Sequence, residues 1–88
     1  EVEARIVAHE SGVAAARAAA LVAFARRVRR LREQGLAEGP GTRLVVAAGR
    51  LIAGGIPPEQ ACHAAMAAPL TDDPDLLAAI ADLAAATV

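Results

Sequence analysis

The sequence predicts an all-α fold, a small bundle of four to five short helices. Apolar residues recur at intervals of three and four along most of the chain. No segment alternates apolar and polar residues with period two, so we expect no strands. The connections between the periodic segments are short and contain glycine or proline. At 88 residues, the chain is expected to form one domain with a modest core.

Residues 1–10 are the first predicted helix. The residues that recur at helical spacing are Val2, Ile6 and His9 or Glu10. Ser11 and Gly12 then interrupt or cap this helix, because glycine readily adopts the backbone conformation that ends one.

Residues 13–34 are the longest predicted helix. Its apolar stripe consists of Leu21, Phe24, Val28 and Leu31. Its remaining faces carry a run of arginines at 26, 27, 29, 30 and 32. Gly35 is the expected C-terminal cap.

Residues 35–41 are rich in glycine and predict a loop, and Thr42 is expected to cap the third helix with its hydroxyl group. The predicted buried face of this helix consists of Leu44, Val45, Ala48, Leu51 and Ile52. Gly54 and Gly55 end it.

The last part of the chain predicts two shorter helices. The fourth begins at Pro57-Pro58-Glu59 and is closed by Pro69. Its inward residues are expected to be Ala61, Ala64, Ala65 and Met66. The fifth begins at Asp72 or Asp73, because acidic side chains stabilise a helix N-terminus. Its apolar stripe consists of Leu76, Leu77, Ile80 and Leu83.

Charge is distributed unevenly along the chain. The chain has no lysine, and all nine arginines lie in residues 1–50. Residues 51–88 therefore contain neither lysine nor arginine. The molecule should therefore have a positive side and a negative side. The net charge of −1 argues against a nucleic-acid-binding protein.

Arg43 is the candidate binding residue. It follows Gly39-Pro40-Gly41-Thr42, at the expected start of the third helix. A helix N-terminus and a guanidinium group both attract phosphate, so together they predict a phosphate contact. The alternative is an ordinary solvated arginine.

The arginine run at 26–32 is a second candidate surface. It contains no interleaved aromatic residue, so base stacking is not expected, and no nucleic-acid partner is predicted. The run is either a solvated helix face or the binding face of a stand-alone helical protein-interaction module with an acidic partner.

The sequence predicts neither a metal site nor a catalytic residue in this chain. His9, Cys62 and His63 are too scattered to bind zinc, and capping explains the acids near Asp73. There is no phosphate-binding Gly-x-x-x-x-Gly-Lys loop, so the fragment alone should neither bind ATP nor hydrolyse it. A single cysteine, with no secretory signal and no membrane-spanning run, indicates a cytoplasmic protein without a membrane partner.

Three segments resemble a known family. They are residues 4–13 (ARIVAHESGV), residues 41–52 (GTRLVVAAGRLI) followed by Gly55, and residues 69–74 (PLTDDP). Together they resemble the C-terminal domain of the CbbQ/NirQ/NorQ family, in the MoxR branch of the AAA+ ATPases. The resemblance covers essentially the whole chain. Gly41 stands where the family pattern has a serine or a similar small residue.

This resemblance implies that residues 1–88 are the α-helical lid domain of a longer AAA+ ATPase. Thr42-Arg43 then corresponds to the sensor 2 motif, whose arginine contacts the γ-phosphate of ATP, bound with Mg in the main domain. The implied partners are that main domain, neighbouring subunits of a hexameric ring and a protein with a von Willebrand A domain. The implied role of the full-length protein is ATP hydrolysis coupled to activation of Rubisco or nitric oxide reductase.

Overall fold

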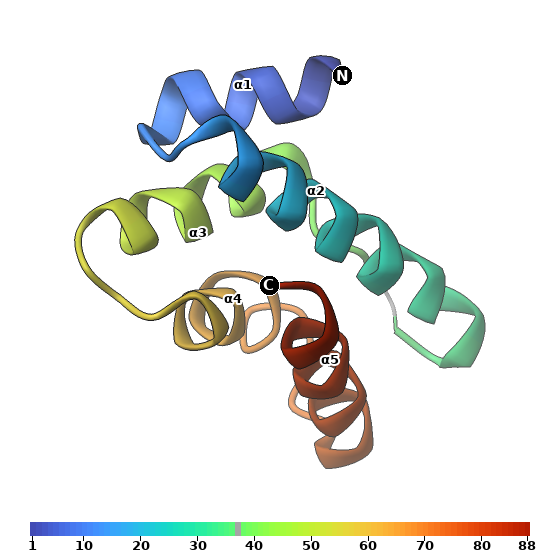
Figure 1. The fold of residues 1–88 in the computed structure, drawn as a ribbon. Coiled ribbons are helices and arrows are strands. Elements are labelled where there is room, and N and C mark those ends of the chain that lie inside the picture. The colour runs from blue at the N-terminus through green and yellow to red at the C-terminus, as the bar shows by residue number, and fades with distance from the viewer. Residues whose placement is uncertain (37) are drawn as a thin grey trace.

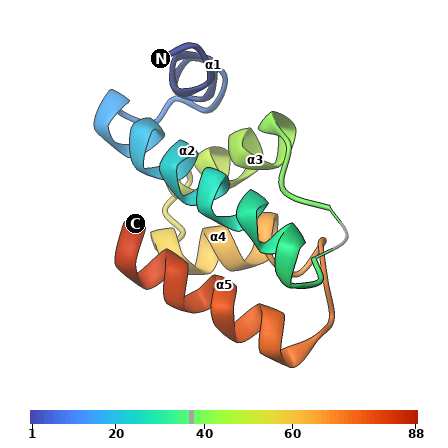
Figure 2. The same cartoon turned by 90° about the vertical axis from the view of Figure 1, so that its right-hand side faces the viewer.

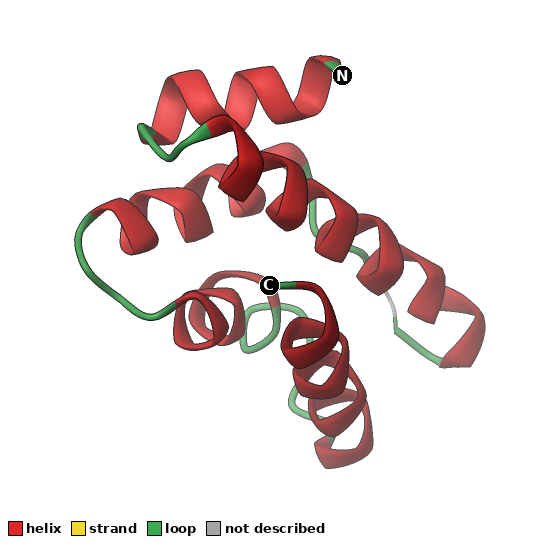
Figure 3. Ribbon diagram, in the orientation of Figure 1, coloured by secondary structure: helices red, strands yellow, loops and turns green. Residues whose placement is uncertain are grey.

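The computed structural model describes residues 1–36 and 38–88, and it confirms the all-helical prediction for them. Figure 3 shows helices joined by loops, with no strand among these residues. The elements are α1 (Val2–Ser11), α2 (Ala15–Arg29), the 3-10 helix η1 (Arg30–Gln34), α3 (Thr42–Ala53), α4 (Pro58–Met66) and α5 (Pro74–Thr87).

The helices pack in an open bundle around α2 and α3. Figures 1 and 2 show α1 on one side of the α2–α3 pair, and α4 and α5 on the other. Accordingly, α1 contacts both α2 and α3, while α4 contacts α3 and α5 contacts α2. The centre contains Phe24, Leu21 and Met66, all fully buried. Aliphatic side chains, many of them alanine and valine, therefore form the core with the single phenylalanine.

Most predicted helix ends are confirmed, because local residues determine them. Gly12 and Gly35 end their helices with φ of 86° and 108°, in the left-handed region that glycine favours. Pro58 lies in the first turn of α4. The carboxylate of Asp73 accepts hydrogen bonds from the backbone N–H groups of Asp75 and Leu76, at 2.8 and 3.4 Å.

Residues 13–34 do not form one continuous α-helix as predicted. The α-helix begins at Ala15 and ends at Arg29, and Arg30–Gln34 tighten into the 3-10 helix η1 before Gly35. A 3-10 turn is a common way for a helix to satisfy its last carbonyl groups. The predicted loop 35–41 is confirmed at its described positions, and Ala37 lies outside the described residues.

Two residues predicted to be inward are exposed, Leu51 in α3 and Ala64 in α4. Successive residues of a helix are rotated by about 100°, and both residues fall far from the centre of the buried face. In α4 that face is formed by Ala61, Cys62, Ala65 and Met66. In α3 it is formed by Val45, Val46, Ala48 and Gly49, and Leu44 and Ile52 are partly buried.

The outer face of α1 carries apolar side chains. Val2 and Ile6 are 64% and 43% exposed, while Val7 on the opposite face is fully buried. The prediction that Val2 and Ile6 belong to a helix is therefore confirmed, but the face of α1 that carries them points away from the core. No helix formed by the described residues is long and apolar enough to cross a membrane.

Candidate functional site

The segment that leads into α3 is pressed against α2. Pro40 is buried, and its carbonyl accepts a hydrogen bond of 2.8 Å from Arg29 Nε. A Cβ atom placed on Gly39 would lie 2.8 Å from Arg29 Cγ and 3.0 Å from Arg29 Cα, so only glycine allows this approach. The path of the chain into α3 is thus determined by its contact with Arg29.

Gly41, and not Thr42, occupies the N-cap position of α3. Its extended backbone has φ of −79° and ψ of 172°, and its carbonyl accepts hydrogen bonds from Leu44 and Val45. The predicted capping role of Thr42 is therefore wrong. Thr42 is the first helical residue, and its hydroxyl instead donates a hydrogen bond of 2.9 Å to the carboxylate of Glu3. Because the helix begins one residue earlier than predicted, the Thr42 side chain lies within the first turn, where its hydroxyl donates to this carboxylate.

Glu3 joins three parts of the chain at one carboxylate. Its Oε1 accepts a hydrogen bond of 3.1 Å from Arg29 Nη1, and its Oε2 accepts one of 2.7 Å from Arg29 Nη2. Because Oε2 also accepts the Thr42 hydroxyl, α1 is connected both to α2 and to the start of α3. We call Glu3, Arg29, Pro40 and Thr42 the Glu3 cluster.

The Glu3 cluster is charged, and it is sheltered from solvent. The side chains of Glu3 and Arg29 are 17% and 32% exposed. The hydrogen bonds from Arg29, with that from Thr42, hold the pKa of Glu3 below its ordinary value, although partial burial opposes this shift. The same hydrogen bonds to Glu3 raise the pKa of Arg29. Both groups are therefore ionised at neutral pH, and their pairing is the two-point guanidinium–carboxylate type.

Arg43 is exposed in the first turn of α3, next to the Glu3 cluster. Its guanidinium forms no hydrogen bond or ion pair with any of residues 1–36 or 38–88. The first backbone amides of an α-helix have no acceptor within the helix. The Arg43 guanidinium therefore lies at the N-terminus of α3, which is the positive end of the helix dipole. The Glu3 cluster holds this end of α3 against α1 and α2. A phosphate group fits this combination.

The arginine run at 26–32 does not form one open face. Arg29 is bound within the Glu3 cluster, Arg26 pairs with Glu1, and Arg27 donates to the Thr87 hydroxyl at 3.1 Å. Arg30 and Arg32 are exposed, with no side-chain partner among the described residues. Three of the five arginines thus contact other parts of the chain, and the predicted role of the run in binding an acidic partner remains a prediction.

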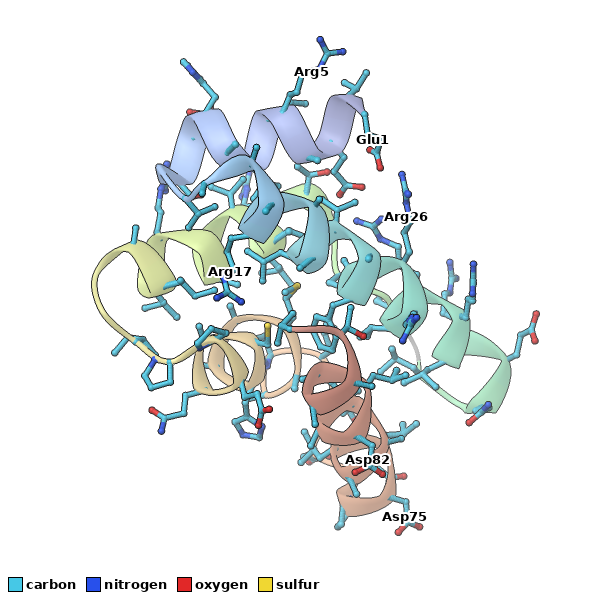
Figure 4. The ribbon with its side chains drawn as sticks, viewed as in Figure 1. Glu1, Arg5, Arg17, Arg26, Asp75 and Asp82 are labelled. Atoms are coloured by element: carbon cyan, nitrogen blue, oxygen red, sulfur yellow. The ribbon has the colours of Figure 1, made fainter. Side chains whose placement is uncertain are left out.

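The remaining charges divide between two parts of the molecule. Figure 4 shows Arg5 and Arg26 on the side of α1 and α2, and Asp75 and Asp82 on α5 at the other side. α4 and α5 contain no arginine or lysine. The side of α1 and α2 also carries acids, with Glu1 labelled there in Figure 4, so the predicted division holds for α4 and α5 but is not a purely positive face opposite them.

The other candidate ligands do not form a site among the described residues. No group of three His, Cys, Asp or Glu side chains there is placed to hold a metal ion. Cys62 is fully buried, and this burial raises the pKa of its thiol to about 11. A separate pocket of about 290 Å³ lies over Phe24 and Ile80, between α4 and α5. It does not include the start of α3.

Sequence reasoning identified Arg43 as a candidate but missed the Glu3 cluster. Glu3 lies 26 residues from Arg29 and 39 from Thr42 in the chain. No local pattern marks such a contact. Two signals were nevertheless present, an acidic residue in the first turn of α1 and the glycine at 39.

Comparison with known proteins confirms the family resemblance. The chain matches the model of the family described as CbbQ/NirQ/NorQ C-terminal, over residues 3–87. The chain belongs to this family.

Three relatives illustrate the match. The protein CbbQ of Hydrogenophilus thermoluteolus is 59% identical over 76 residues, which are 86% of this chain and 28% of that protein. The denitrification regulatory protein NirQ of Pseudomonas aeruginosa is 46% identical over 81 residues, 92% of this chain and 31% of that protein. The protein NorQ of Paracoccus denitrificans is 46% identical over 84 residues, 96% of this chain and 31% of that protein. The chain thus spans less than a third of each relative.

Proposed function

We propose that this CbbQ/NirQ/NorQ C-terminal chain is the lid of a longer AAA+ ATPase, and that Arg43 is its sensor 2 residue. In this role the guanidinium contacts the γ-phosphate of ATP, which is bound with Mg²⁺ in the main domain of the parent protein. One observation carries the proposal. The Arg43 guanidinium is exposed and has no hydrogen-bond or ion-pair partner among the described residues, while the first turn of α3 that bears it is held by the Glu3 cluster. Family membership supports it, because the segment around Arg43 is one of those that carry the resemblance.

The chemistry of the contact explains how the lid responds to nucleotide. A charge-assisted hydrogen bond contributes about 1.5–3 kcal/mol. This contact exists only while the γ-phosphate is present, so hydrolysis removes it and changes the preferred orientation of the lid. The packed bundle then moves as a rigid body about its junction with the main domain.

The proposed parent is a cytoplasmic hexamer that activates other enzymes. In a ring, lid rotation in one subunit is transmitted to the next, and a von Willebrand A domain protein links the ring to its client. Rubisco and nitric oxide reductase are the proposed clients. The name of one relative, denitrification regulatory protein, supports a regulatory role.

The test uses the full-length parent protein and its ATP turnover. Arg43→Ala is expected to lower kcat/KM for ATP by roughly tenfold or more, which corresponds to one lost charge-assisted hydrogen bond. Arg43→Lys keeps the charge but not the planar fork, so we expect it to recover only part of the activity.

Arg32→Ala is the matched control. Arg32 is also exposed, lies in the 3-10 helix η1, and has no side-chain hydrogen bond or ion pair among the described residues. We expect Arg32→Ala to keep turnover within about twofold of the unmodified protein, because a solvated surface charge contributes little. Equal activity of the Arg43→Ala and Arg32→Ala proteins would contradict the sensor role.

A further inference from the structure

We infer that Glu3 is a positioning residue for Arg43, which it orients through Thr42 and Arg29. The inference rests on the proposed function, because it concerns how the phosphate-contacting arginine is held. Glu3 itself does not touch nucleotide in this scheme. Its role is to fix the first turn of α3 relative to α1 and α2.

The contacts form a closed path around the start of α3. Glu3 accepts two hydrogen bonds from Arg29, and Arg29 Nε donates a third to the Pro40 carbonyl at 2.8 Å. Thr42, two residues further along, donates to Glu3 Oε2 at 2.9 Å. The segment from Pro40 to Thr42 is therefore held at both ends by one ion pair.

All three nitrogen atoms of the Arg29 guanidinium are used in this path. A lysine at this position could not replace them, because it has one nitrogen and no planar fork. Since Thr42 and Arg43 are adjacent in a helix, a shift of the Thr42 backbone moves the base of Arg43 with it. A displacement of about 1 Å at a reacting group can reduce a rate by roughly a hundredfold.

A second ion pair provides an internal control for this role. Arg26 and Glu1 also join α2 to α1, but their side chains are 52% and 40% exposed. Figure 4 shows this pair at the open edge between the two helices. Neither residue forms a side-chain hydrogen bond with the described part of residues 35–43. Removing the Glu1 charge therefore weakens the α1–α2 contact without releasing α3.

The experiment is a double-mutant cycle in the full-length parent protein, with kcat/KM for ATP as the readout. The four proteins are the unmodified one, Glu3→Gln, Arg43→Ala and the double variant. Glu3→Gln is expected to lower kcat/KM by about tenfold, and Glu1→Gln by less than about twofold. In the Arg43→Ala background, Glu3→Gln is expected to change kcat/KM by less than about twofold, since the residue that it positions is absent.

Two results would overturn the positioning role while leaving the proposed function standing. One is a loss from Glu3→Gln no larger than that from Glu1→Gln. The other is an undiminished loss from Glu3→Gln in the Arg43→Ala background, which would mean that Glu3 acts through general stability. If Arg43→Ala alone has no effect on kcat/KM, the proposed function and this inference both fail.

If the Glu3→Gln protein does not fold, the Thr42→Val variant tests the same positioning role. It removes only the hydroxyl that reaches Glu3 and leaves the Glu3–Arg29 pair in place. We expect a loss of about threefold in kcat/KM, which again disappears in the Arg43→Ala background. A Thr42→Val protein with full activity, or with a loss that persists without Arg43, would overturn the inference.

Discussion

The two ion pairs between α1 and α2 have the same chemistry but different surroundings. Both are arginine–carboxylate contacts, and they lie about one helical turn apart on α2. The Glu1–Arg26 pair is exposed, and Glu1 otherwise only accepts a hydrogen bond of 3.0 Å from the Glu3 backbone N–H at the start of α1. The Glu3–Arg29 pair is largely sheltered and also binds Thr42 and the Pro40 carbonyl. Shelter and additional partners, rather than charge alone, make the second pair the contact that determines structure.

The difference also explains why an arginine-rich segment need not be a binding surface. Within the run at 26–32, the sheltered Arg29 is fully engaged by the fold. Arg43, outside the run, forms no side-chain hydrogen bond or ion pair with the described residues. The number of arginines in a segment therefore does not predict function here. The burial and the partners of each guanidinium do.

The largest change in stability is expected at Gly39, whose backbone packs against Arg29 of the sheltered ion pair. Gly39→Ala places a methyl group 2.8 Å from Arg29 Cγ and 3.0 Å from Arg29 Cα, so the segment entering α3 must move away from α2. We expect the free energy of unfolding to fall by about 1–3 kcal/mol, as in other overpacked sites. Urea denaturation measures this loss. A Gly39→Ala protein as stable as the unmodified chain would show that this contact is not tight.

A smaller and pH-dependent effect is expected when each ion pair loses its acid. At pH 7, Glu3→Gln should lower the free energy of unfolding by about 1.5 kcal/mol, while Glu1→Gln should lower it by about 0–0.5 kcal/mol. Urea denaturation of the two variants compares them directly. Equal losses would remove the distinction between the pairs.

The sign of the pH dependence follows from the lowered pKa of Glu3. The stabilisation from this group is fully present above the unfolded-state value, near 4.5, and is lost as the pH falls through the lower folded-state value. The difference between the unmodified chain and Glu3→Gln should therefore be constant near neutrality and shrink below about pH 4.5. A difference that grows on acidification would contradict the assigned pairing.

The smallest effect is expected at Gly41, beside the same cluster but outside its tight contact. A Cβ atom there meets nothing within 4 Å, and the backbone is already in the extended N-cap conformation. Gly41→Ser should add a capping oxygen and raise the free energy of unfolding by a few tenths of a kcal/mol. Thermal unfolding of this variant beside Gly39→Ala compares two glycines two residues apart. A marked loss from Gly41→Ser would mean that the first turn of α3 is more crowded than described.

The sequence was sufficient for features that depend on neighbours in the chain. Asp73, Gly12 and Gly35 act as predicted, because capping involves residues within one turn. The stripe of α2 was also predictable, since Leu21, Phe24, Val28 and Leu31 are all buried. The family resemblance was recognisable for a similar reason, because each of its three segments is an unbroken stretch of sequence.

The features that could not be predicted depend on long-range packing. Thr42 has the residue type of an N-cap, yet Gly41 occupies that position and the Thr42 hydroxyl donates to a carboxylate from α1. Ala64 and Leu51 are apolar, yet the rotation of their helices exposes them. Arg29 differs from its neighbours in the run only through its contacts in the folded chain. Such assignments need the relative positions of the helices, which periodicity alone does not provide.

The most direct test of the proposed role of Arg43 is the affinity of the full-length parent protein for ATP and for ADP, with and without Arg43→Ala. A contact to the γ-phosphate exists only with ATP. We therefore expect Arg43→Ala to weaken binding of a non-hydrolysable ATP analogue by roughly tenfold or more and to leave ADP binding within about twofold. Equal weakening of both nucleotides, or of neither, would contradict a γ-phosphate contact by this residue.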